Sequence, residues 1–126
     1  MTLNCIRAVT AAILFMPLDA CVGISSDEIR SAPKETVISE RHLDEVLVCF
    51  QKQEALEMRN TVTTFPQANR VEIAVTALQA GRIRHYYLIT LMPFKGRTQI
   101  ALQDARLTNA VSRSEMLNII QRCAGT

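Results

Sequence analysis

Residues 71–104 read VEIAVTALQAGRIRHYYLITLMPFKGRTQIALQD, three apolar segments separated by Ala80-Gly81 and Lys95-Gly96. The segments span 71–78, 83–92 and 97–104. Glycine tolerates the positive φ that a tight hairpin turn demands. The stretch therefore predicts a three-stranded antiparallel meander, whose middle segment is apolar on both faces as suits a central strand.

A helical segment precedes the meander, at 40–58, and Ser39 is its expected N-cap. Four of its apolar residues recur at the helical i, i+3, i+4, i+7 spacing. They are Leu43, Val46, Leu47 and Phe50. Cys49 falls at the margin of this apolar face, where it could reach a neighbouring helix. The connection that follows, 59–69, is expected to be a loop, because Pro66 disfavours a strand running through it.

A second helical segment follows the meander. Ser112 and Glu115 fit a capping box, and Gly125 stands where the helix should end. Its apolar positions are Met116, Ile119, Ile120 and Cys123. This spacing turns Cys123 toward the core together with the other three residues.

These segments predict one α+β domain over 39–126, a two-layer α-β-β-β-α arrangement with both helices on one face of the meander. Residues 21–38 contain Ser, Gly, Pro and charged residues without a sustained period, so we expect a flexible tether there. The 126 residues suffice for one domain, and 48% hydrophobic residues is typical of a globular protein. A net charge of +2 is too small to indicate nucleic acid as a partner.

The first twenty residues have the features of a secretory signal peptide. Arg7 precedes the mostly apolar run 8–16, which Pro17 ends. This run is too short for a transmembrane helix, which needs ~20 residues, but it suits the apolar core of a signal. The alternative is a buried N-terminal helix. A signal over 1–20 is favoured, because a polar segment follows and the rest of the chain makes a domain without it.

The residues Leu18-Asp19-Ala20-Cys21 resemble the lipobox of bacterial lipoprotein precursors, with Leu at −3, a small residue at −1 and Cys at +1. The resemblance covers residues 1–21. It implies cleavage before Cys21, diacylglycerol on the thiol and an acyl chain such as palmitate on the new amine. Asp19 departs from the usual small or apolar residue at −2. The alternative is ordinary signal cleavage, for example after Ala20 or Gly23.

The cysteine count fits lipidation. The chain contains Cys5, Cys21, Cys49 and Cys123, and Cys5 leaves with the signal. Thiols tend to pair in the oxidising compartment that an exported chain enters. A Cys49–Cys123 disulfide would leave Cys21 for the lipid. Alternatively, Cys49 and Cys123 are small buried residues.

Few residues suggest catalysis or metal binding. His42 and Glu45 share a helix face, but two ligands do not make a metal site. His85 lies beside two tyrosines, yet no nucleophile motif accompanies it. Phosphate-loop, dinucleotide, C-x-x-C and zinc-protease motifs do not occur. We therefore expect no catalytic residue, no metal, no cofactor and no enzymatic activity.

Six basic residues against two acidic ones occupy 70–106. Arg84, Tyr86 and Leu88 fall on the meander face that we expect to be open. One interpretation is that the charges sit at hairpin ends and strand edges, where they prevent aggregation. The other is a docking face for another envelope protein or an anionic envelope component, because aromatic residues and Arg anchor interfaces.

The favoured function is a small lipoprotein of the bacterial cell envelope that acts by binding rather than by catalysis, with the membrane as a partner through its N-terminal lipid. Val22 at +2 is not the aspartate that resembles an inner-membrane retention signal, which favours the outer membrane, facing the periplasm. Two alternatives are a small periplasmic enzyme, such as a hydrolase, and a non-lipidated secreted binding or inhibitor domain.

Overall fold

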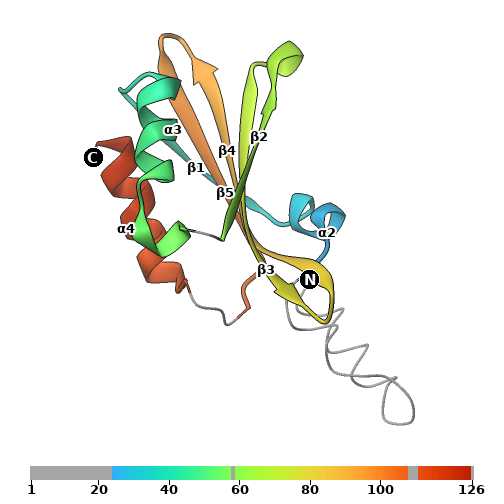
Figure 1. Cartoon of the computed structure of the whole chain (residues 1–126). Helices are drawn as coiled ribbons and strands as arrows, with labels where there is room; N and C mark the ends of the chain where they lie inside the picture. Colours follow the sequence, from blue (N-terminus) through green and yellow to red (C-terminus); the bar gives the residue numbers. More distant parts are fainter. Residues whose placement is uncertain (1–23, 58, 108–110, 126) are drawn as a thin grey trace.

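The computed structural model describes residues 24–57, 59–107 and 111–125 and has an α+β fold. Its five strands form one antiparallel sheet in the order β1-β5-β4-β3-β2 (Figure 1). The elements are α2 (Ser26–Arg30), β1 (Lys34–Ser39), α3 (Leu43–Gln51), η2 (Glu54–Leu56), β2 (Asn60–Phe65), η3 (Pro66–Ala68), β3 (Arg70–Gln79), β4 (Arg82–Phe94), β5 (Arg97–Asp104) and α4 (Arg113–Ala124).

The predicted meander forms the centre of this sheet, as β3, β4 and β5. Ala80 and Gly81 have φ values of 50° and 74°, and Lys95 and Gly96 have values of 51° and 78°. Two-residue turns with positive φ at both positions are of type I′, whose twist matches that of the strands they join. The local turn chemistry therefore sets the register of β4 with β5, and that of β3 with β4 from Gln79↔Arg82 as far as Thr76↔His85, beyond which the register shifts.

The sheet has two strands more than the predicted three, one at each edge. Residues 34–39, expected in the tether, form β1 and pair with β5, from Lys34↔Gln103 to Ser39↔Thr98. Residues 60–65, expected in a loop, form β2 and pair with β3. Edge strands are short and expose many side chains, so their apolar periodicity is weak. Pairing with β5 and β3 therefore defines β1 and β2 more clearly than their own apolar patterns do.

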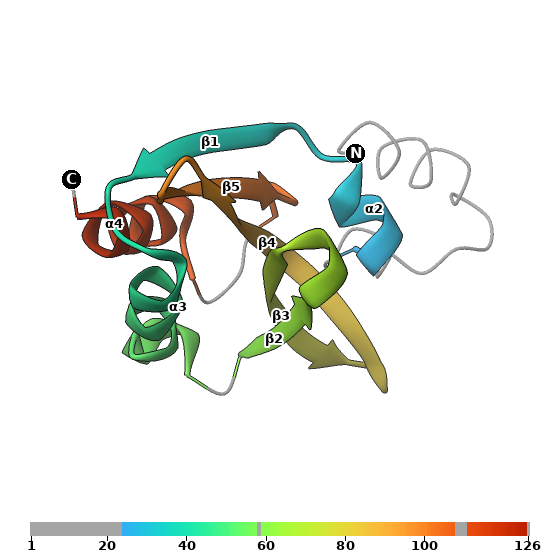
Figure 2. The same ribbon diagram turned by 90° about the horizontal axis from the view of Figure 1, so that it is seen from above.

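Helices α3 and α4 pack side by side on one face of the sheet, as predicted (Figure 2). The core beneath them includes Val46 and Phe50 from α3, Met116 from α4 and Ile89 from β4, all buried. Helix α3 begins later than predicted, with His42 as N-cap. Ser39 instead ends β1, and its buried hydroxyl donates a hydrogen bond to the carbonyl of Ala124. In α4 the prediction is confirmed: the Ser112 side chain accepts a hydrogen bond from the Glu115 amide.

Helix α2 covers part of the opposite face, which makes the fold three-layered rather than two-layered (Figure 2). Ile29 is buried in a second apolar cluster with Ile24, Leu88 and Ala105. The Gln103 side chain donates to the carbonyls of Arg30 and Ala32, at 2.7 and 2.9 Å. The prediction of a flexible tether over 21–38 is therefore wrong for residues 24–38, because α2 packs on the sheet and residues 34–38 belong to its edge strand β1.

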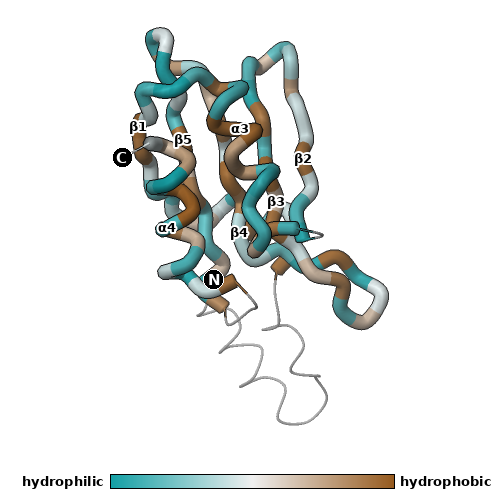
Figure 3. The backbone as a smooth tube through the Cα atoms, turned by 60° about the vertical axis from the view of Figure 1, so that its left-hand side comes forward, coloured by the Kyte–Doolittle hydropathy of each residue, from teal (hydrophilic) through white to brown (hydrophobic). Residues whose placement is uncertain are grey.

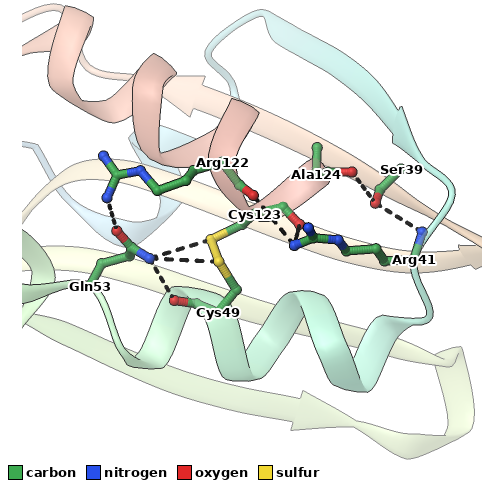
Figure 4. Close-up of a disulfide and its surroundings, with 7 residues drawn as sticks. All are labelled: Ser39, Arg41, Cys49, Gln53, Arg122, Cys123 and Ala124. Carbon is green, nitrogen blue, oxygen red and sulfur yellow. Dashed lines mark hydrogen bonds between the residues drawn. A yellow bond between two sulfur atoms is a disulfide. The ribbon is translucent and has the colours of Figure 1, made fainter. Parts of the chain in front are cut away.

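A disulfide joins Cys49 and Cys123, and their Cα atoms lie 5.4 Å apart (Figure 4). The predicted proximity of α3 and α4 at this point is confirmed. Polar groups surround the bond: the Gln53 amide donates to the Cys49 carbonyl at 3.0 Å and accepts from Arg122 at 2.6 Å. Arg41 donates hydrogen bonds to the carbonyls of Arg122 and Cys123. Its positive charge there interacts favourably with the negative C-terminal end of the α4 dipole.

Candidate functional site

A groove lies on the face of the sheet opposite α3 and α4, with a volume of about 410 Å³. Helix α2 packs mainly over β4 and β5, so it leaves the β2–β3 half of this face uncovered. We call this hollow the outer groove. Its lining includes Ser26 and Arg30 from α2, Thr61 and Thr63 from β2, Glu72 and Thr76 from β3, and Ile83 and His85 from β4. Ile29, Ala74 and Leu88 also line the outer groove, so its surface consists mostly of hydroxyl-bearing and apolar side chains.

An ion pair joins the two walls of the outer groove. Arg30 of α2 donates to both carboxylate oxygens of Glu72 on β3, at 2.5 and 2.8 Å. These hydrogen bonds from Arg30 hold the pKa of Glu72 below its usual range, although burial acts in the opposite direction. The charge of Arg70, whose Nε lies 3.6 Å from the same carboxylate, also lowers it. The buried carboxylate is thus already neutralised.

His85 lies at the end of the outer groove where Ile24 pairs with β4. Its backbone amide donates to the Ile24 carbonyl at 2.8 Å, and the Ile24 amide donates back to the His85 carbonyl at 3.2 Å. Burial lowers the pKa of the imidazole because it disfavours the charged form; Arg30 adds to this and the Ile24 backbone opposes it. The buried Nδ1 atom has no hydrogen-bond partner within the described part of the chain.

A β-bulge explains why His85 reaches this face. Val75 pairs with Tyr87, but the next residue of β3, Thr76, pairs with His85, so Tyr86 is an extra residue in β4. An extra residue reverses the alternation of side chains beyond it. His85 therefore shares a face with Leu88 instead of opposing it.

The predicted docking strip of Arg84, Tyr86 and Leu88 does not exist as one face. Tyr86 is 4% exposed and belongs to the core that α3 and α4 cover, and its hydroxyl accepts a hydrogen bond from Gln79. Leu88 is 3% exposed, packed with Ile29 of α2 on the other side of the sheet. The bulge separates Arg84 and Tyr86 from Leu88, and α2 covers Leu88 and the β4–β5 part of the face that we expected to be open.

Among the described residues that line the outer groove, no serine or threonine is hydrogen-bonded to the buried Nδ1 of His85. Ser25, the residue before α2, accepts a hydrogen bond from the Glu28 amide and donates to the Glu28 carboxylate, so it caps the helix. His42 and Glu45 lie far from the groove, at the exposed start of α3. Within the described ranges, no group of three or more His, Cys, Asp or Glu side chains could hold a metal ion.

Sequence reasoning missed the threonines of β2 and the whole of α2. The signal for β2 was present, because NTVTTF is rich in the β-branched residues that favour strands and ends immediately before Pro66. The signal for α2 was also present, since Ser25 and Glu28 have the spacing of a capping box. Five helical residues are too few for an apolar period.

Cys21 and the predicted signal over 1–20 lie outside the described residues, so the structure does not bear on them. Among the residues that it does describe, no helix has the length and apolar character needed to cross a bilayer. Comparison of the chain with protein-family models, curated proteins and solved structures finds no match. Function is therefore inferred from the residues and their geometry.

Proposed function

We propose that this protein is an exported, lipid-anchored component of the bacterial cell envelope that acts by binding rather than by catalysis. The observation that carries the proposal is the pairing of Cys49 with Cys123. Such a bond suits an oxidising compartment outside the cytoplasm. Because Cys5 lies in the proposed signal, the pairing leaves Cys21 as the one cysteine of the mature chain that is free to carry lipid.

The character of the outer groove supports binding. Its threonines and apolar residues offer hydrogen bonds and contact area, whereas its carboxylate is held by Arg30. Strand β2 borders the groove and forms the edge of the sheet, so one side of its backbone has no strand partner within the described residues. An extended segment of another envelope protein could pair with such an edge and place its side chains in the groove.

The alternative function is a small periplasmic hydrolase, and one observation favours it. His85 lies in a groove, and burial lowers the pKa of its imidazole, which favours the neutral form that a general base needs. A hydrolase would also need a nucleophile held against this imidazole and a group that orients it. Ser25 is engaged at the helix cap and Glu72 at Arg30, and the buried Nδ1 of His85 has no hydrogen-bond partner among the described residues. Binding is therefore the better-supported function.

Mass spectrometry of the purified protein tests the anchor. We expect a mature chain that begins at Cys21 and carries diacylglycerol, and incorporation of an alkyne-labelled palmitate into the membrane fraction. Cys21→Ser should abolish the label, whereas the matched control Cys5→Ser should retain it, because Cys5 is removed with the signal. An unmodified N-terminus at Cys21 or later would exclude the lipoprotein function and leave a secreted binding domain.

A further inference from the structure

The hairpin between β3 and β4 projects beyond the rest of the sheet (Figures 1 and 3). Strand β2 pairs with β3 only as far as Val75, and β5 pairs with β4 only as far as Tyr87. Residues 76–85 therefore form a ribbon of two strands past these partners. Figure 3 shows this ribbon reaching out past the ends of α3 and α4.

The end of this ribbon exposes two large apolar side chains. Leu78 is 74% exposed and Ile83 is 64% exposed, the highest values for large hydrophobic residues within the described part of the chain. They are directly opposite each other in the register of β3 and β4. Paired apolar residues at the tip of a projecting hairpin contribute nothing to the core, and together they offer an exposed apolar surface for contact with another apolar phase.

The surroundings of this apolar pair are basic. Arg82 and Arg84 flank Ile83, and no acidic residue occurs between Glu72 and Asp104. Arg82 pairs across the ribbon with Gln79, and Arg84 with Ala77, so neither faces a carboxylate in the register. Side chains alternate along a strand, so Arg82 and Arg84 lie on the other face of the same tip from Leu78 and Ile83. A hairpin tip with one apolar and one basic face is complementary to a bilayer surface that presents anionic phosphates above acyl chains.

The same ribbon adjoins the point where the chain enters the described fold. Ile24 pairs with His85, two residues from Ile83. Cys21 precedes Ile24 by three residues, which span at most ~11 Å when fully extended. A lipid on Cys21 would thus hold the Ile24–His85 bridge within about that distance of the bilayer surface. The tip of the ribbon lies a similar distance beyond the bridge, since a strand rises ~3.3 Å per residue.

We propose that the β3–β4 hairpin tip is a second membrane contact, in which Leu78 and Ile83 enter the interface of an anionic phospholipid bilayer while Arg82 and Arg84 bind its phosphates. The inference rests on the proposed lipid anchor, which would keep the tip at high effective concentration near the bilayer. The lipid on Cys21 and the hairpin tip together would fix the orientation of the domain on the membrane. A lipid on a long flexible tether would leave the domain free to turn. In this orientation the outer groove, which Ile83 and His85 line at one end, opens beside the membrane surface.

Tryptophan fluorescence tests this contact, because the chain contains no Trp. The lipidated full chain carrying Ile83→Trp is reconstituted into vesicles of phosphatidylethanolamine and phosphatidylglycerol, brominated near the top of the acyl chains. Phe94→Trp is the matched control, since Phe94 is also an exposed apolar residue of β4 but lies at its opposite end. We expect quenching about twofold or more stronger for Ile83→Trp than for the control, as for a side chain seated in the headgroup and acyl boundary.

The outcomes separate the two proposals. Equal, weak quenching of both variants in a protein that carries the lipid would overturn the hairpin contact and leave the anchored function standing. If Cys21 carries no lipid, the lipid anchor and the hairpin contact are both overturned, because the short distance from the bilayer to the hairpin was derived from a lipid on Cys21. The role of the two arginines is tested by adding Arg82→Glu and Arg84→Glu to the Ile83→Trp variant. We expect these charge reversals to reduce the quenching to that of the Phe94→Trp control. Quenching that these charge reversals leave unchanged would exclude the role proposed for the two arginines.

Discussion

The imidazole of His85 sits between the backbone of Ile24 and the outer groove, in the charge field of Arg30. Its pKa is lowered mainly by burial, so the folded state binds this proton less readily than the unfolded state. Stability should then fall as pH drops through the unfolded pKa of about 6.5 toward the folded value, and the loss is complete below the folded value.

We therefore expect the free energy of unfolding to decrease between pH 7.5 and pH 5, and His85→Gln to flatten this decrease. Urea unfolding at several pH values measures it. His42→Gln is the matched control: its side chain is exposed before α3, so this variant should keep the slope of the wild type. Equal slopes for wild type and His85→Gln would show that the imidazole is not the source of the pH dependence.

The short helix α2 is held to the sheet by contacts of three kinds. Ile29 is 1% exposed, Arg30 forms an ion pair with Glu72, and Gln103 donates to the carbonyls at the end of the helix. A helix of five residues has little stability of its own in water. Its position therefore depends on these tertiary contacts, which also form one wall of the outer groove.

Ile29→Ala should destabilise the protein by about 2–5 kcal/mol, because it leaves a cavity beneath α2 and removes buried apolar surface. Urea unfolding of the full chain measures this free energy. Val37→Ala on β1 serves as the control, since Val37 is 36% exposed and its truncation should cost no more than about 0.5 kcal/mol. If Ile29→Ala proves as harmless as the control, the burial of Ile29 does not hold α2 on the sheet.

The Cys49–Cys123 bond ties the last helix to the first helix of the core and spans most of the fold, with a sequence separation of 74 residues. In the chain-entropy model, closing a loop of this length restricts the unfolded chain and contributes about 4 kcal/mol. That is a large share of the net stability of a small domain. The pairing thus provides stability as well as indicating an oxidising compartment.

Replacing both cysteines, Cys49→Ala with Cys123→Ala, should lower the free energy of unfolding by several kcal/mol, with the chain-entropy model giving about 4. Guanidinium unfolding of envelope-extracted protein measures the change, and the dithiothreitol-treated wild type should match the double variant. Cys21→Ser is the control and should unfold like the wild type. A loss below about 1 kcal/mol would indicate that the bond is absent or that the reduced chain retains structure.

Much of this fold follows from local features of the sequence. The turn residues at Gly81 and Gly96, the cap at Ser112 and the helical spacing of Val46 and Phe50 each depend on residues a few positions apart. Such signals act before distant segments meet, so they predict the meander, its two covering helices and the approach of Cys49 to Cys123. The signal peptide over 1–20 and the lipid site at Cys21 are also read from local patterns, and they remain predictions.

The pairing of the edge strands, the place of α2 on the sheet and the face of each side chain in β4 depend on contacts between distant residues. Strand β1 pairs with residues of β5 that follow it by 59 to 69 positions, and α2 is held by Gln103 and Glu72. The bulge at Tyr86 moved His85 into the outer groove and removed Tyr86 from it. A slip of one residue reverses a strand face at little local cost, so packing on both sides of the sheet decides it.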